Sequence, residues 1–115
     1  MSYVADTAYV GHYARVCDNA VVRGNAHVQG HAHVQGHAIV SGHANVGGGT
    51  IVTDNAQISG NARIQGNVRV RGNVRVLDHA LVQGDVIVWG NTILEGYVNI
   101  FPGRVYQIHW WRDIP

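Results

Sequence analysis

The chain has 115 residues, a formal net charge of +1 and 46% hydrophobic residues. This length predicts one domain, and the small charge argues against bulk electrostatic binding to nucleic acid polymers or to an anionic membrane. No apolar run is long enough to span a membrane and no amino-terminal signal segment is evident, so the expected location is cytoplasmic. All eight basic residues are arginine. Arginine favours planar contacts at an interface or an anion site, and the alternative is arbitrary variation of surface residues.

From residue 1 to residue 102 the chain repeats every six residues without an insertion. In each unit the second residue is small and mostly alanine, and the sixth and first residues are of types that tolerate turns and positive φ. A period of six fits neither a helix nor a simple strand alternation, so it predicts a β-solenoid. The fourth residue of every unit is aliphatic: Val4, Val10, Val16, Val22, Val28, Val34, Val40, Val46, Val52, Ile58, Ile64, Val70, Val76, Val82, Val88, Leu94 and Ile100.

Units such as NARIQG at 61–66 resemble those of the hexapeptide-repeat superfamily, and most of all those of the YdcK-like solenoids labelled as acyltransferases. The resemblance implies an all-β, single-domain, left-handed parallel β-helix with three units in each triangular coil. Residues 1–102 would then form five to six coils. Residues 103–115 break the repeat, and we expect this tail, with Trp110 and Trp111, to cap the last coil or to pack on a neighbouring subunit.

With eighteen residues per coil, residues eighteen apart lie on the same face. The second face is polar and is expected to contact solvent. The other two carry aliphatic columns that a soluble monomer would rarely leave bare, so we expect them to be buried by association between copies. The resemblance implies that this assembly is a homotrimer. The columns of the first face include Val21, Ile39 and Ile93, and those of the third include Ile51, Ile87 and Trp89 and end at Val105.

Five histidines are concentrated between residues 27 and 43, and neutral imidazole is a common zinc ligand. His31, His37 and His43 would occupy successive corners of one coil and point apart, so these histidines are expected to replace asparagine in ladders of turns. The γ-class carbonic anhydrases of the superfamily use a His-x4-His pair, which this chain lacks. The sequence therefore predicts no metal site and no cofactor.

A candidate ligand site surrounds the run Gly47-Gly48-Gly49, where a missing side chain would leave a notch open to close approach by a ligand or another chain. Arginine and histidine beside an aromatic ring suit a planar ligand that bears phosphate. The alternative is that these arginines only keep the prism soluble. The predicted lining is His31, His33, Gly49, Ile51, Asn67, Arg69, Arg71 and Trp89.

The sequence leaves three functions open. We favour a non-catalytic trimer that binds a small anionic, nucleotide-like ligand in grooves between its subunits. The second is a structural trimeric spacer. The third, which the resemblance implies, is a coenzyme A-dependent acyltransferase with His31 or His33 as the general base.

Overall fold

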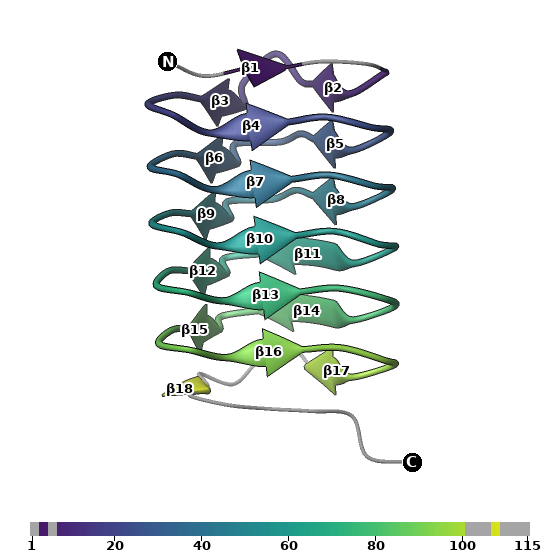
Figure 1. Cartoon of the computed structure of the whole chain (residues 1–115), viewed down its shortest axis with the longest axis vertical. Helices are drawn as coiled ribbons and strands as arrows, with labels where there is room; N and C mark the ends of the chain where they lie inside the picture. Colours follow the sequence, from purple (N-terminus) through teal and green to yellow (C-terminus); the bar gives the residue numbers. More distant parts are fainter. Residues whose placement is uncertain (1–2, 5–6, 101–106, 109–115) are drawn as a thin grey trace.

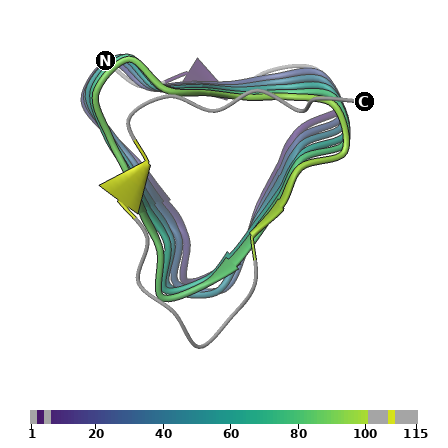
Figure 2. The same ribbon diagram turned by 90° about the horizontal axis from the view of Figure 1, so that it is seen from below.

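A computed structural model describes residues 3–4, 7–100 and 107–108 of the chain. It is a parallel β-solenoid of about five turns, and no helix occurs among these residues (Figure 1). The chain winds from β1 to β18 in a left-handed sense, and its cross-section is triangular (Figure 2). The predicted fold class is confirmed.

Each side of the triangle is a parallel sheet of six short strands. Sheet A contains β1 (Tyr3–Val4), β4 (Val21–Val22), β7 (Ile39–Val40), β10 (Gln57–Ile58), β13 (Arg75–Val76) and β16 (Ile93–Leu94). Sheet B contains β2 (Tyr9–Val10), β5 (His27–Val28), β8 (Asn45–Val46), β11 (Arg63–Gly66), β14 (Leu81–Gly84) and β17 (Asn99–Ile100). Sheet C contains β3 (Arg15–Val16), β6 (His33–Val34), β9 (Ile51–Val52), β12 (Arg69–Val70), β15 (Ile87–Val88) and β18 (Gln107–Ile108).

The six-residue pattern places one alanine or valine and one larger aliphatic residue inside each side of a coil. Val34 pairs with Val52, and Val52 with Val70, so these residues form one interior column. Their exposed fractions are 0%, 0% and 1%. Because inward and outward side chains alternate along a strand, the residue before each of these valines faces outward. The predicted register of eighteen residues is confirmed for these coils.

The last strand departs from that register. Ile87 in β15 pairs with Gln107 in β18, which lies twenty residues further along the chain. Val105, which was predicted to continue the column of Ile87, lies outside the described residues, and the described partner of Ile87 is Gln107. The predicted boundary between residues 102 and 103 lies outside the described residues and stays a prediction, as do the positions of Trp110 and Trp111.

Hydrogen bonds between coils follow the same register. The Tyr9 amide donates to the Ala26 carbonyl at 2.9 Å, and the Arg63 amide donates to the Ala80 carbonyl at 2.9 Å. The residues that precede most corners have φ near +60 to +90° and are glycine or aspartate. Glycine adopts this region at no steric cost, and aspartate is among the few other residues that tolerate it.

Two threonines occupy interior positions where other coils have alanine or valine. Thr50 and Thr92 are both 0% exposed. A buried hydroxyl is costly unless it is hydrogen-bonded. The Thr50 hydroxyl donates to the Gly47 carbonyl at 2.7 Å, and the Thr92 hydroxyl donates to the Trp89 carbonyl at 2.6 Å. The narrow core therefore accepts both hydroxyls without an unsatisfied polar group.

Candidate functional site

The predicted ligand site is only partly assembled. A shallow hollow of about 280 Å³ is lined by four of the eight predicted residues, Gly49, Ile51, Asn67 and Arg69, together with Asp85, Val86 and Ile87. A second hollow of about 280 Å³ beside it is lined by Ile51, Thr53, Arg69, Val70 and Arg71. The notch at Gly49 exists, but it extends toward the carboxyl-terminal coils.

His31, His33 and Trp89 line neither hollow. The His31 ring lies against Tyr13 of the preceding coil, with 5.2 Å between ring centroids. The notch is bordered instead by Asn67, whose amide donates to the Asp85 carboxylate at 3.1 Å. Within the described residues no group of three or more histidine, cysteine, aspartate or glutamate side chains could hold a metal ion.

The largest hollow, of about 640 Å³, lies at the corner between sheets A and B and was not predicted. His43, Asn61 and His79 line it from the corner, and Asn45, Arg63 and Leu81 line it from sheet B, with Ala80 between them. The signal in the sequence was the alternation of histidine and asparagine in this corner column. The hollow is polar and open, and no buried reactive group faces it.

The two ends of the described solenoid differ from its interior. β1, β2 and β3 each pair on one side only, and so do β16, β17 and β18. Val4, the first residue of the inward column, is 46% exposed, whereas Val22 and Val40 in the same column are 0% exposed. Ala8, Val10, Ala14 and Val16 of the first coil are only partly buried. The amino-terminal end therefore presents an apolar surface bordered by unpaired strand edges.

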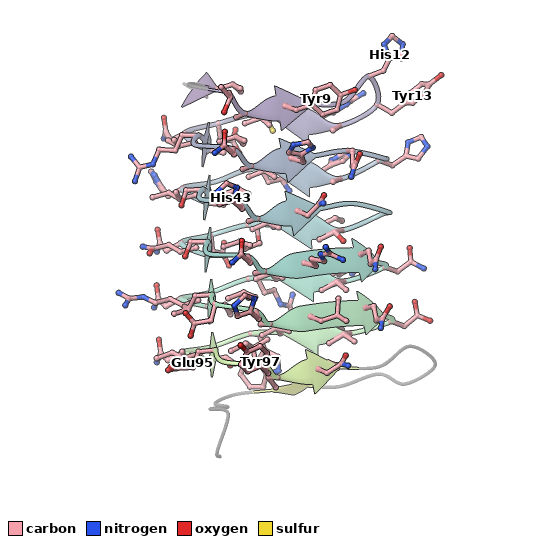
Figure 3. The ribbon with its side chains drawn as sticks, turned by 90° about the vertical axis from the view of Figure 1, so that its right-hand side faces the viewer. Tyr9, His12, Tyr13, His43, Glu95 and Tyr97 are labelled. Carbon is pink, nitrogen blue, oxygen red and sulfur yellow. The ribbon has the colours of Figure 1, made fainter. Side chains whose placement is uncertain are left out.

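Aromatic residues gather at these ends. None of the nine Phe, Tyr and Trp residues lies between residues 14 and 88. Tyr9 and Tyr13 project from the first coil beside His12, and Tyr97 projects from the last, as Figure 3 shows. Their exposed fractions are 52%, 65% and 75%. Exposed aromatic side chains are enriched at protein interfaces, so their absence from the middle coils makes the ends candidate contact surfaces.

The outward aliphatic side chains of the lateral faces are less exposed than Val4. Val21, Ile39 and Ile93 on sheet A, and Ile51 and Ile87 on sheet C, are all partly buried in the single chain. Trp89, beside sheet C, is 37% exposed, so one residue of the predicted interface does present apolar surface. No helix within the described parts of the chain has the length and apolar character needed to cross a bilayer.

Comparison with known families identifies the family of the chain. Residues 4–103 match the model of the bactofilins, described as polymer-forming cytoskeletal proteins. The chain belongs to the bactofilin family. No curated protein sequence matches the chain. The matched residues span nearly all of the six-residue repeat and end before β18.

Membership of the bactofilin family corrects several predictions. The assignment to the hexapeptide-repeat, acyltransferase-like family is wrong, and so are the nucleotide-binding homotrimer and its two alternatives, the trimeric spacer and the acyltransferase. A six-residue period reports the geometry of a coil, which different β-helix families share, and it carries no information about chemistry. Bactofilins self-assemble into polymers, so the coarser expectation of association between copies is retained.

Proposed function

We propose that this chain is the subunit of a cytoskeletal polymer that grows by stacking the ends of its β-solenoid. One observation carries the proposal: the inward column that is 0% exposed at Val22 is 46% exposed at Val4. Contact with a second copy would remove this apolar surface from water, which is the main favourable term in protein association.

The strand edges support the same contact. An unpaired edge is a template for pairing with another chain, and natural proteins usually cover or charge such edges. Among the edge strands at the amino-terminal end, β2 ends in Val10, carries Tyr9 on its outward side and has no charge, whereas β3 carries Arg15. A subunit that kept its edges apart from other copies would be expected to place charged side chains or proline there. The predicted cytoplasmic location stays part of this proposal.

The test is the substitution Val4→Glu. Val4 is 46% exposed in the single chain, so a glutamate there reaches solvent and the fold is retained. In a stacked junction the same carboxylate would be buried without a partner, which costs several kcal/mol. We expect the unsubstituted chain to form filaments visible by electron microscopy and to sediment. The variant should remain dispersed at roughly 100-fold higher concentration.

Gln57→Glu is the matched control. Gln57 is exposed on the outward side of β10, in the middle of sheet A, and the substitution adds one negative charge there. This variant should sediment as the unsubstituted chain does. Filaments of Val4→Glu at the original concentration would refute end-to-end assembly. Loss of filaments in Gln57→Glu alone would place the contact on a lateral face instead.

A further inference from the structure

Except for Glu95, which stands at an outward position beside sheet A, the described charges of opposite sign occupy different parts of the solenoid. The six arginines of the described residues, Arg15, Arg23, Arg63, Arg69, Arg71 and Arg75, all stand at outward positions of the flat faces. Asp18, Asp54, Asp78 and Asp85 stand at corners, and three of them accept backbone amides of the next coil. The outward positions of sheet C hold no carboxylate between Arg15 and Trp89. The outward positions of that face are therefore basic. The corner residue Asp85 lines the same hollow as Arg69, and its carboxylate accepts the Asn67 amide.

Arg69 and Arg71 form the most concentrated part of this charge. Val70 between them points inward and is 1% exposed, so both arginines project to the same side of sheet C. At the rise of a β-strand their Cα atoms lie about 6.6 Å apart. Both side chains are exposed, and no hydrogen bond or ion pair engages either of them within residues 3–4, 7–100 and 107–108.

The surface around this pair is hollowed and partly apolar. Arg69 and Ile51 line both hollows of sheet C, and Arg71 and Thr53 line the second. Gly49 has no positive φ, and a Cβ there would lie 2.9 Å from the Asn67 side-chain oxygen. The backbone therefore does not require glycine at this position, and the absence of a side chain keeps the first hollow open.

We propose that sheet C binds an extended acidic segment of a partner protein through Arg69 and Arg71. Carboxylates at alternate positions of an extended peptide project to one side about 6.6–7 Å apart, which matches the spacing of the two arginines. Each guanidinium can then hold one carboxylate by charge-assisted hydrogen bonds, and aliphatic parts of the segment can occupy the hollows beside Ile51. The strands of sheet C already pair on both sides at β12, so the contact is made by side chains.

A second copy of the chain does not complement this face. Placing sheet C against sheet C would oppose arginine with arginine, and sheet B presents Arg63 with no carboxylate at its described outward positions. Sheet A presents a single described carboxylate, Glu95, which does not supply the two that the arginine pair requires. The corner aspartates Asp18, Asp54 and Asp78 already accept backbone amides. The inference therefore goes beyond self-assembly. In a polymer the face would recur on every subunit, which would raise the avidity for a partner with several acidic segments.

The test uses two synthetic heptapeptides with blocked ends and a fluorescent label. Both contain two glutamates in a background of serine and glycine, at the third and fifth positions in one and at the third and fourth in the other. We expect fluorescence anisotropy at low ionic strength to show roughly tenfold tighter binding of the alternating peptide, because only its two carboxylates reach both arginines. Arg69→Gln and Arg71→Gln should each weaken this binding roughly tenfold.

Arg75→Gln is the matched control, because Arg75 is exposed in the same coil but belongs to sheet A. It should leave the binding unchanged. Equal binding of the two peptides, or binding that survives both substitutions on sheet C, would overturn the proposal. Binding of phosphatidylglycerol vesicles with the same dependence on Arg69 and Arg71, without binding of either peptide, would also overturn it in favour of a lipid surface. Repeating the measurement with Val4→Glu separates this result from any failure of polymerisation.

Discussion

The adjacent glycines Gly48 and Gly49 should respond in opposite ways to the same substitution. Gly48 has a φ of +67°, and an added Cβ would lie 2.6 Å from both the amide nitrogen and the carbonyl oxygen of Gly66 in the next coil. The left-handed conformation costs alanine about 1–2 kcal/mol, and displacing a packed neighbour costs about 1–3 kcal/mol more. Gly48→Ala should therefore lower the free energy of unfolding by about 2–5 kcal/mol.

Gly49→Ala is the internal comparison. Its φ is not positive, and the nearest atom to an added Cβ is the Asn67 side-chain oxygen at 2.9 Å, which can rotate away. Alanine also reduces the conformational entropy of the unfolded chain, which is worth about 0.4–1 kcal/mol in favour of the fold. The cost of moving the Asn67 side chain and this entropic gain nearly cancel, so the free energy of unfolding should change by less than about 1 kcal/mol.

Urea denaturation followed by circular dichroism measures both values, with the Val4→Glu background used to keep the chain dispersed. The slope of free energy against urea should be the same for all variants, because the surface exposed on unfolding is unchanged. Two results would refute the explanation that close contact between corner backbones requires glycine there. One is a Gly48→Ala variant as stable as the parent, and the other is a Gly49→Ala variant that loses as much stability as Gly48→Ala.

Two further pairs of substitutions test the corner and the core. Asp54 has a φ of +61°, and its carboxylate accepts the Gly72 amide at 2.9 Å. Asp54→Ala should therefore lower the free energy of unfolding by about 2 kcal/mol. Asp54→Asn keeps an acceptor and tolerates this φ, so it should lower the free energy of unfolding by less than about 1 kcal/mol. Equal losses in thermal denaturation would contradict this explanation. Val52 is 0% exposed in the interior column, so Val52→Ala should cost about 2–3 kcal/mol and the outward Ile51→Ala clearly less. The reverse order would mean that the outward face contributes more to stability than the interior.

The architecture followed from the sequence because one local rule applies to every coil. An aliphatic residue at each fourth position predicts the pairing of Val34 with Val52, and the pairing follows that register. The rule fails at Gln107, where two additional residues precede the strand and no periodic signal marks the change. Registers of repeats are predictable as long as the repeat continues.

The candidate surfaces were harder to predict because they depend on departures from the repeat. The notch at Gly49 was predicted from a missing side chain, but its neighbours were not, since the His31 ring turns toward Tyr13 instead of into the notch. The expectation that the tail packs on a neighbouring subunit did not extend to end-to-end assembly, although the confinement of aromatic residues to residues 3–13 and 89–111 was visible in the sequence. A periodic pattern describes what all coils share, whereas function is carried by the coils that differ.

From β1 to β17, paired strands lie eighteen residues apart in the sequence. Whole turns of this part of the solenoid are therefore interchangeable as units of length. Removing residues 37–54 would join Gly36 to Asn55, return every following side chain to its former column and shorten the prism by about 4.8 Å. Duplicating the same segment would lengthen it by an equal step. Such a protein can change its size by insertion or loss of a complete turn while the surfaces at its two extremities stay as they are.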